Sequence, residues 1–294
     1  MLQKLKLQAT FAALLVARKV HMPTALKLRD VVLEDFYQWV SATIDEPEVS
    51  FMNLGYLPAE GEALELSPEE ELNRSAIQLY HRVAGAVDVA GKEVLEVGSG
   101  RGGGAEQIHR RLGAARVVGL DRSDQAVAFC ARHHAREGLE FRQGKAEELP
   151  FPDASFDAVV NVESSHCYSP VERFFAEVRR VLRPGGHFLF ADFRAAEGGI
   201  ATLGRQLDEA GFDLLEKETI TAPVLAALAR DDAEKRAQIA RRLPGLRNAL
   251  MRKMLATFVA AKETTFHQKF ATGEWQYDRY VLTPRAGAAG PAEA

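Results

Sequence analysis

The chain has 294 residues, of which 47% are hydrophobic and 27% charged, and its formal net charge is −4. This composition is typical of a globular enzyme with one large domain, and the negative balance gives no electrostatic footprint for nucleic acid. The two cysteines, Cys130 and Cys167, are too few for a disulfide scaffold and belong to no zinc-ligand pattern. No apolar run reaches the roughly 20 residues that a membrane-spanning helix needs, so we predict a cytoplasmic protein with free thiols and no transmembrane segment.

Residues 1–85 are predicted to form a mostly helical lid segment. Apolar side chains recur at helical spacing over 28–40, which indicates an amphipathic helix. The apolar run 11–16 is too short for a signal peptide, and we expect a helix packed on the body or, alternatively, on a membrane surface or a partner. The stretch 51–58 interrupts the pattern with a glycine and a proline, which predicts a loop. Another helix is expected over 73–87, just before the first strand.

Strands and helices then alternate, as in a doubly wound α/β sheet. Short apolar runs predict strands near 93–98, 116–121, 139–143, 156–162 and 186–192. The stretches between them predict helices near 104–112, 124–136 and 170–182. Pro184 and the two glycines after it are expected to end the last of these helices and to start the fifth strand.

The C-terminal part departs from this alternation. It predicts a helix over 201–210, a strand over 212–219 and a helical insertion over 222–268 with a corner at Pro244-Gly245. Alternating aromatic residues over 275–282 favour an antiparallel strand at the edge of the sheet. The residues from Arg285 are mostly Ala, Gly and Pro and predict a disordered tail. We divide the chain into lid, core, cap, closing strand and tail, at 1–85, 86–221, 222–270, 271–284 and 285–294.

The glycine-rich stretch Val94–Gly104 predicts a buried strand that turns sharply into a helix, where a ligand can approach the backbone closely. Glu96 stands two residues before the first glycine, and Asp121 closes the next apolar run. A carboxylate at Glu96 would repel the pyrophosphate of a dinucleotide, which otherwise binds at a helix N-terminus. S-adenosylmethionine instead carries a sulfonium and an ammonium, which suit Glu96, and ribose hydroxyls, which suit Asp121. The pattern therefore favours the methyl donor over a dinucleotide.

The series of motifs resembles that of class I S-adenosylmethionine-dependent methyltransferases. It comprises Glu96–Gly102, Asp121, Leu149–Asp153 with Ser155-Phe156-Asp157, and Leu182–Gly186. Three further stretches are similar to mycobacterial phthiotriolone and phenolphthiotriolone O-methyltransferases, which belong among bacterial polyketide and natural-product O-methyltransferases. These stretches are Asn73–Arg82, Gly102–Gly104 and Asn161–Tyr168. The resemblance implies a Rossmann-like, seven-stranded, mostly parallel sheet with an antiparallel C-terminal strand, a helical N-terminal lid and a helical insertion.

The resemblance also implies a donor site at the carboxyl ends of the strands. The expected contacts are Tyr80, Glu96, Gly98, Ser99, Gly100, Gly103, Asp121, Arg122, Gln125, Ala146, Glu147 and Asn161. Tyr80 would close over the methionine end of the donor, with a core position as the alternative, and Asn161 would hold the methionine carboxylate or amine. Where many members of the family have Gly-Asp-Ala, this chain has a lysine, Lys145, which cannot accept a hydrogen bond. We therefore expect the Ala146 backbone and the Glu147 side chain to contact the adenine.

Methyl transfer to an alcohol removes a proton from the acceptor, so a base within reach assists the reaction. His166 follows the fourth strand, at the ligand-binding end of the sheet, and its imidazole titrates near neutrality, which predicts a general base. Asp192 ends the fifth strand and is expected to orient His166 or to hold an acceptor hydroxyl, with helix capping as the alternative. Acceptor contacts are expected at Asn53, Tyr56, Glu163 and Tyr168, of which Glu163 binds the acceptor or faces the sulfonium. No group of aspartates suits a catalytic Mg²⁺, so we predict a metal-independent mechanism.

The predicted acceptor is a small, apolar, polyketide-like molecule, because apolar side chains of the insertion would line its pocket. These side chains are Leu225, Leu228, Leu246, Leu250, Met251, Met254, Leu255 and Phe258. The alternatives are carbon or nitrogen methylation on the same fold, a dinucleotide-dependent oxidoreductase, and a non-catalytic binding protein. The intact Gly98, Gly100, Asp121 and His166 argue against the last of these. Whether the chain forms a homo-oligomer stays open.

Overall fold

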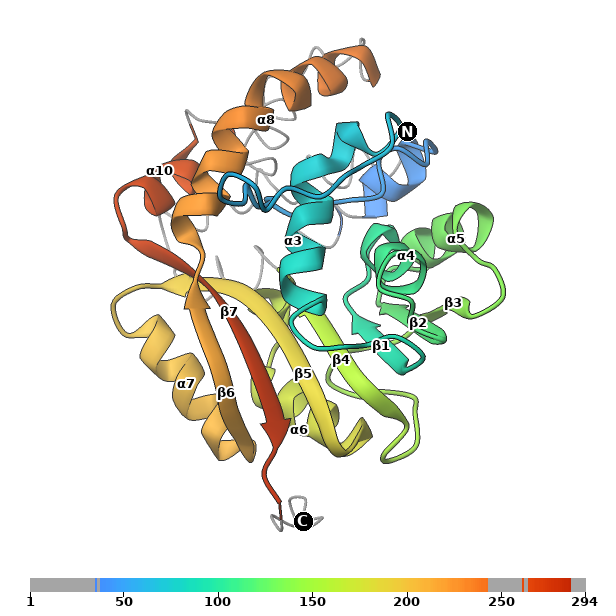
Figure 1. The fold of residues 1–294 in the computed structure, drawn as a ribbon, viewed down its shortest axis with the longest axis vertical. Coiled ribbons are helices and arrows are strands. Elements are labelled where there is room, and N and C mark those ends of the chain that lie inside the picture. Colours follow the sequence, from blue (N-terminus) through green and yellow to red (C-terminus); the bar gives the residue numbers. More distant parts are fainter. Residues whose placement is uncertain (1–34, 36–37, 243–260, 262–263, 287–294) are drawn as a thin grey trace.

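The computed structural model describes residue 35 and residues 38–242, 261 and 264–286. They form a seven-stranded sheet in the order β3-β2-β1-β4-β5-β7-β6, with helices on both faces (Figure 1). The helix predicted at 11–16, most of the one at 28–40, the Pro244-Gly245 corner and the tail from residue 287 lie outside the described residues. None of the described helices is both long enough and apolar enough to cross a membrane.

Five parallel strands form one part of the sheet, and the sequence predicted all five. They are β1 (Glu93–Val97), β2 (Arg116–Asp121), β3 (Leu139–Gln143), β4 (Phe156–Val162) and β5 (Leu182–Ala195). β5 begins at Leu182, directly after the preceding helix, so Pro184, which was expected to end that helix and to start the strand, lies inside the strand. The strand order reverses at β1, whose neighbours are β2 and β4. Open α/β sheets bind ligands beyond the carboxyl ends of the strands at such a point.

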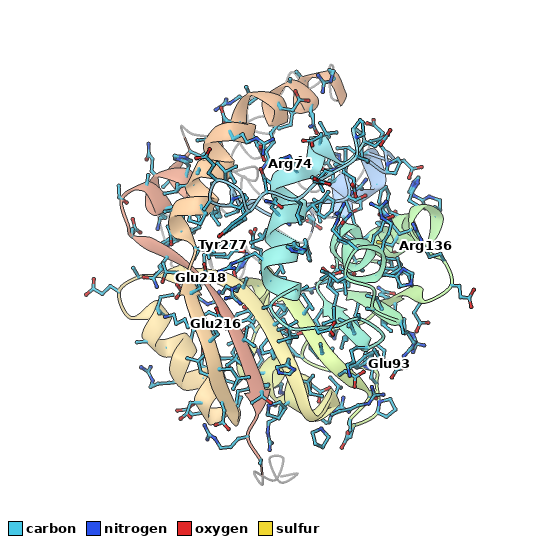
Figure 2. All side chains as sticks on the ribbon, in the orientation of Figure 1. Arg74, Glu93, Arg136, Glu216, Glu218 and Tyr277 are labelled. Atoms are coloured by element: carbon cyan, nitrogen blue, oxygen red, sulfur yellow. The ribbon has the colours of Figure 1, made fainter. Side chains whose placement is uncertain are left out.

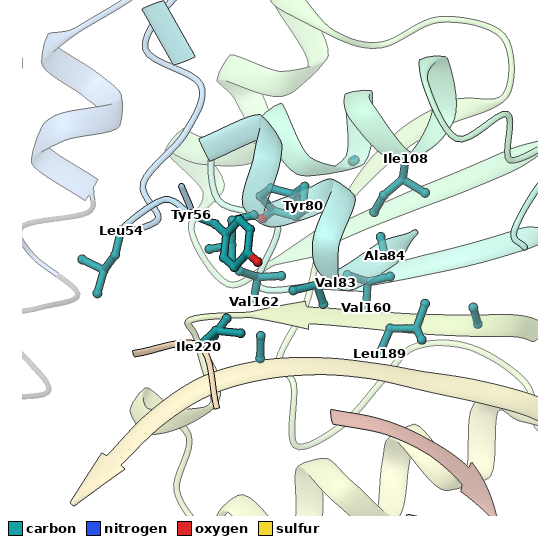
Figure 3. Packing of buried hydrophobic residues seen from close by; sticks show 14 of the residues in the cluster. Leu54, Tyr56, Tyr80, Val83, Ala84, Ile108, Val160, Val162, Leu189 and Ile220 are labelled. Carbon is teal, nitrogen blue, oxygen red and sulfur yellow. The ribbon is translucent and has the colours of Figure 1, made fainter. Parts of the chain in front are cut away.

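Helices cover both faces of the sheet. The described ones are α3 (Arg74–Ala84), α4 (Gly103–Arg110), α5 (Asp124–His133), α6 (Val171–Val181), α7 (Gly199–Glu209), α8 (Thr221–Arg242) and α10 (Thr265–Ala271), with short 3-10 turns η1 (Glu71–Asn73) and η2 (Ser165–Cys167). Successive strand residues point to opposite faces. Val94 packs in a core with α3, α4 and α8 (Figure 3), whereas Leu95 packs in a second core with α6 and α7. Glu96 therefore points to the same face as Val94, although it is a carboxylate.

Two further strands complete the sheet, β6 (Phe212–Thr219) and β7 (Trp275–Pro284), and β7 runs antiparallel to both of its neighbours, β5 and β6. The antiparallel direction of β7 was predicted, but its expected place at the edge is wrong, because β7 lies between β5 and β6. The burial pattern gives the reason: β7 is buried from Tyr277 to Leu282, whereas most of β6 is exposed. Arg279 of β7 forms ion pairs with Glu216 and Glu218 of β6 (Figure 2).

The helical residues 38–43 are followed by an irregular segment that extends to α3. A mostly helical lid was expected here. No helix is assigned in the described residues 44–70. Two prolines, Pro47 and Pro58, and two glycines with positive φ, Gly55 and Gly61, account for this difference, because neither residue type suits a helix interior. The segment crosses the ligand end of the sheet, where the backbone N–H of Tyr56 donates to the Ser75 carbonyl at 2.9 Å.

Gly55 provides a test of this packing. Its φ is +87°, and a Cβ there would lie 2.7 Å from the Cβ of Ser75. We expect Gly55→Ala to lower the free energy of unfolding by more than the roughly 1–2 kcal/mol that a left-handed backbone costs an L-residue. Gly61 has nearly the same φ, +86°, with no atom within 4 Å of its Cβ position. Gly61→Ala is therefore the control, and equal losses in denaturant unfolding of the two variants would contradict the packing.

Candidate functional site

A turn rich in left-handed residues joins β1 to α4. Gly98, Gly100 and Gly102 have φ values of +75°, +52° and +82°, a region in which glycine pays no steric cost. The backbone N–H groups of Gly98 and Ser99 donate to the carbonyl of Leu120 at 2.8 and 3.1 Å, so the turn is fastened to β2. A Cβ at Gly98 would lie 2.4 Å from a serine hydroxyl of the β4–η2 turn. Glycine is therefore needed here for both conformation and space.

A cavity of about 530 Å³ opens beside this turn. The predicted donor contacts that line it are Tyr80, Gly98, Ser99, Gly100, Asp121, Arg122, Ala146 and Glu147. The predicted acceptor contacts that line it are Asn53, Glu163 and Tyr168. Within the described part of the chain, its wall does not include Tyr56, Glu96, Gly103, Gln125, Asn161, His166 or Asp192.

Some of these residues support the wall instead of forming it. Asn161 is fully buried, and its side-chain amide donates to the Val97 carbonyl at 2.8 Å and to Ser164 Oγ at 2.7 Å. It therefore fixes the strand ends behind the cavity, where a direct contact with the methionine end was expected. Tyr56 packs in the core that β1 shares with α3 and is 7% exposed, so it stands away from the acceptor contact predicted for it.

Asp121 is held by both of its carboxylate oxygens. Oδ2 accepts the backbone N–H of Gly100 at 2.8 Å, and Oδ1 accepts that of Ser123 at 2.8 Å. Ser123 in turn caps α5, because its side chain accepts the N–H of Ala126. Burial raises the pKa of Asp121 above its ordinary value, although these bonds oppose the rise. The carboxylate is therefore fixed at the cavity wall, where it can accept hydrogen bonds from a pair of hydroxyls.

Glu96 lies behind the wall, covered by Tyr80. The Tyr80 hydroxyl donates to Glu96 Oε1 at 2.6 Å, and Oε2 has no hydrogen-bond partner among the described residues. A Cβ at Gly104 would lie 2.1 Å from the Tyr80 ring, so the missing side chain makes room for the tyrosine. Burial raises the pKa of Glu96 to about 8. Tyr80, and not Glu96, thus forms the cavity wall at this point, and a direct contact of Glu96 with the donor stays a prediction.

The backbone amides at the turn are already bonded to the chain itself. Gly100 donates to Asp121, Gly102 to the Ser99 carbonyl at 2.9 Å, and Gly103 to the Ser50 carbonyl at 3.2 Å. A dinucleotide needs such N–H groups free for its pyrophosphate. The wall instead offers carboxylates and three buried oxygens without a partner among the described residues, on Ser41, Asn53 and Ser99. These acceptors suit a ligand that is cationic and rich in hydrogen-bond donors.

The partly exposed His166 pairs with the fully buried Asp192 next to the cavity residue Cys167. His166 Nδ1 lies 2.8 Å from Asp192 Oδ1, while Asp192 Oδ2 accepts the His166 backbone N–H at 3.0 Å and the Ser165 hydroxyl at 2.6 Å. Burial opposes ionisation of both groups, but the Asp192 carboxylate raises the pKa of His166 well above its ordinary value. The charges of His166 and Arg194 likewise hold the pKa of Asp192 below its ordinary value. Asp192 thus contacts both the backbone N–H and the ring of His166.

A methyltransferase-domain family model matches residues 95–190. Over 216 residues the chain is 41% identical to a fatty-acid O-methyltransferase of Mycolicibacterium smegmatis, which covers 74% of this chain and 77% of the relative. Over 248 residues it is 38% identical to a phthiotriol/phenolphthiotriol dimycocerosates methyltransferase of Mycobacterium tuberculosis, which covers 84% of this chain and 90% of the relative. The chain belongs to the S-adenosylmethionine-dependent methyltransferases.

Solved structures share the fold of this methyltransferase. The cyclase SpnF superposes with a TM-score of 0.66 at 23% identity, over 87% of this chain and 96% of that one. Geranyl diphosphate C-methyltransferase of Streptomyces coelicolor, in complex with S-adenosylhomocysteine, gives a TM-score of 0.59 at 18% identity, over 84% and 98%. The methyl donor is S-adenosylmethionine, and the fixed carboxylate of Asp121 and the unpartnered oxygens of the wall fit it. In the described ranges no group of three or more His, Cys, Asp or Glu residues could hold a metal ion.

Arg101 was not predicted to have a role in the methyltransferase site. It is fully buried, donates to the carbonyls of Ile44 and Val49, and stacks over the Phe129 ring at 3.6 Å. Burial lowers its pKa to about 10. The arginine therefore ties the irregular N-terminal segment to the glycine turn. The sequence hints at a role for Arg101 only by placing it inside a glycine-rich run. That position does not indicate which distant residues the arginine contacts.

The role of Asp121 is testable by donor-site binding. Hydrogen bonds to charged groups contribute about 1.5–3 kcal/mol, so we expect Asp121→Asn to weaken S-adenosylhomocysteine binding by roughly 10- to 100-fold. Titration calorimetry measures the change. Asp124, which is exposed in the first turn of α5 and is not part of the cavity wall, provides the control. A similar loss of affinity in Asp124→Asn would mean that the net charge of the protein, and not the contact made by Asp121, determines binding.

The raised pKa of Glu96 predicts a proton release on donor binding. With a pKa of about 8, the carboxyl is mostly protonated at pH 7. A cationic donor favours the ionised form and lowers this pKa, so binding at pH 7 should release part of a proton. Calorimetry in two buffers of different ionisation enthalpy measures the release, which should decrease in Glu96→Gln and persist in a variant of the exposed Glu137. An unchanged release in Glu96→Gln would refute the linkage.

Proposed function

We propose that this methyltransferase methylates an oxygen, a hydroxyl or an enol, of a lipid-like or polyketide-like small molecule, with His166 as general base. The pair formed by His166 and Asp192 carries the proposal. Its Nδ1 to Oδ1 distance of 2.8 Å assigns Nδ1 to Asp192, so Nε2 is the ring nitrogen that would accept the proton. The names of the two relatives, a fatty-acid O-methyltransferase and a phthiotriol/phenolphthiotriol dimycocerosates methyltransferase, support a lipid-like acceptor.

S-adenosylmethionine supplies a methyl group on a positively charged sulfonium and becomes a neutral thioether when that group leaves. The chain itself has two tasks, to position the acceptor oxygen and to accept its proton. The Asp192 carboxylate holds the Nδ1–H tautomer of His166, so Nε2 takes the proton from the hydroxyl. Asp192 then stabilises the imidazolium that forms, in the way that a buried carboxylate supports a histidine base.

The surroundings of His166 support an apolar acceptor. Its ring lies 4.5 Å from the ring of Phe193, which stacks on Trp275 at 5.1 Å and meets Phe266 edge-on. Leu228 is buried in the core next to this region. Of the apolar residues expected to line the acceptor pocket, those from Leu246 onward lie outside the described residues. We propose that the irregular N-terminal segment and α8 act as lid and cap over the core domain, since both lie at the ligand end of the sheet (Figure 1).

The pH dependence of turnover tests the base. Because His166 must be neutral to accept a proton and its pKa is raised by Asp192, kcat/KM should rise with pH through a value above 6.5. In Asp192→Asn the carboxylate is lost and burial lowers the histidine pKa, so the inflection should move to lower pH while the rate at high pH falls. In His166→Ala an alcohol acceptor should lose roughly 10²- to 10⁴-fold in rate.

The control for this profile is His133, which pairs with Asp45 at the surface of α5. His133→Ala should leave the profile unchanged. Carbon or nitrogen methylation is the rival reaction on this fold, and an amine acceptor that His166→Ala still methylates at the full rate would overturn the assignment to oxygen.

A further inference from the structure

Three consecutive residues, Phe51, Met52 and Asn53, cross the donor cavity and form part of its wall. We call residues 51–53 the strap. The residue before the strap is held at the glycine turn, because the Ser50 carbonyl accepts the Gly103 N–H at 3.2 Å. The residue after it is held by one side chain, since the Leu54 N–H donates to both carboxylate oxygens of Glu163, at 2.9 and 3.1 Å. The strap is therefore tied on both sides of the cavity, and one of the ties is titratable.

The position of Glu163 is built by several contacts. It follows β4 with a φ of +52°, a left-handed conformation that is unfavourable for a non-glycine residue. Its N–H donates to the Ala191 carbonyl at 2.9 Å, and its Oε1 accepts the Tyr277 hydroxyl at 2.9 Å. Strained residues of this kind persist where their surroundings fix them, and they are concentrated at functional sites. The carboxylate of Glu163 thus contacts the residue that follows the strap, the last strand and the donor cavity together.

We propose that Glu163 is a positioning residue that couples the positive charge of the methyl donor to closure of the strap. A hydrogen bond to an ionised carboxylate is roughly twice as strong as one to a neutral acceptor. A cation in the cavity favours the ionised form of Glu163, which strengthens the bond to the Leu54 N–H. The neutral thioether product provides no such charge, so the strap is held less firmly over it.

The titration of Glu163 suits this role. Burial raises its pKa to about 7, while the bonds from Leu54 and Tyr277 oppose the rise. The other charged or titratable groups that act on it come from four more elements: Asp192 on β5, His166 on η2, Tyr80 on α3 and Lys235 on α8. Without a cation, the carboxyl is mostly neutral below pH 7 and accepts the Leu54 N–H only as a neutral group. A cation lowers the pKa and makes the ionised, closed form stable near neutrality.

Hydrogen exchange of the Leu54 amide measures the closure directly. We expect S-adenosylmethionine to slow this exchange at pH 7 about tenfold more than S-adenosylhomocysteine does, the factor that corresponds to one unit of pKa displacement. In Glu163→Gln, which keeps the shape but cannot ionise, the two ligands should protect the amide equally. In this variant the dissociation constant of S-adenosylhomocysteine divided by that of S-adenosylmethionine should fall by the same factor.

Glu147 supplies a matched control, because its carboxylate also lines the cavity and accepts a backbone N–H, that of Ser169 at 3.1 Å. In Glu147→Gln the difference between the two ligands should persist, even where both bind less tightly. Equal protection by the two ligands in the wild-type protein, which needs no variant to fold, would overturn the proposal, as would a persisting difference in Glu163→Gln. The inference rests on the donor site and uses no acceptor, so its failure leaves oxygen methylation standing, and the reverse also holds.

Discussion

The hydrogen bond from the Gly100 N–H to Asp121 is the interaction on which the rest of the site depends. It joins the turn after β1 to the end of β2, so the conformation of the turn and the direction of the carboxylate are fixed together. The same turn receives the N-terminal segment, through Gly103 and Ser50 and through Arg101. A backbone fully bonded in this way presents oxygen acceptors and negative charge to the cavity. That arrangement explains why the fold, which elsewhere binds phosphates, here binds a cation.

Much of the fold could be predicted because its signals are local. The apolar runs that predicted β1, β2 and β4 are bounded by glycines and polar residues, and parallel strands buried on both faces need such runs. The order of the antiparallel strands could not be read in this way. An alternating pattern such as that of β7 fits an edge or an interior position, and only the exposure of β6 decides between them. The irregular N-terminal segment was predicted only in part: the glycine and proline of 51–58 indicated a loop, whereas Pro47 and Gly61 lie in flanking residues that were expected to be helical.

In the site, too, the residues fixed by local sequence were predicted, whereas those fixed by contacts between distant segments were not. Gly98, Gly100 and Asp121 were predicted at the cavity because the turn that needs them is formed within a few residues. Arg101 was missed because its partners lie more than 50 residues away in the chain, where no spacing rule applies. Glu96 was expected to touch the ligand directly, and the presence of Tyr80 in front of it follows from packing between α3 and α4. Contacts between separate elements are what a single sequence leaves undetermined.

The absent side chain at Gly104 has an evolutionary consequence. The Tyr80 ring occupies the space that a Cβ at position 104 would fill, and its hydroxyl bonds to Glu96. A substitution at any one of positions 80, 96 and 104 therefore restricts which residues fit at the other two. A descendant with alanine at position 104 would need a smaller residue at position 80, and the carboxylate at position 96 would then border the ligand without an intermediary. The size of the side chain at position 104 therefore limits which ring can shield the carboxylate at position 96, with no change in the course of the main chain.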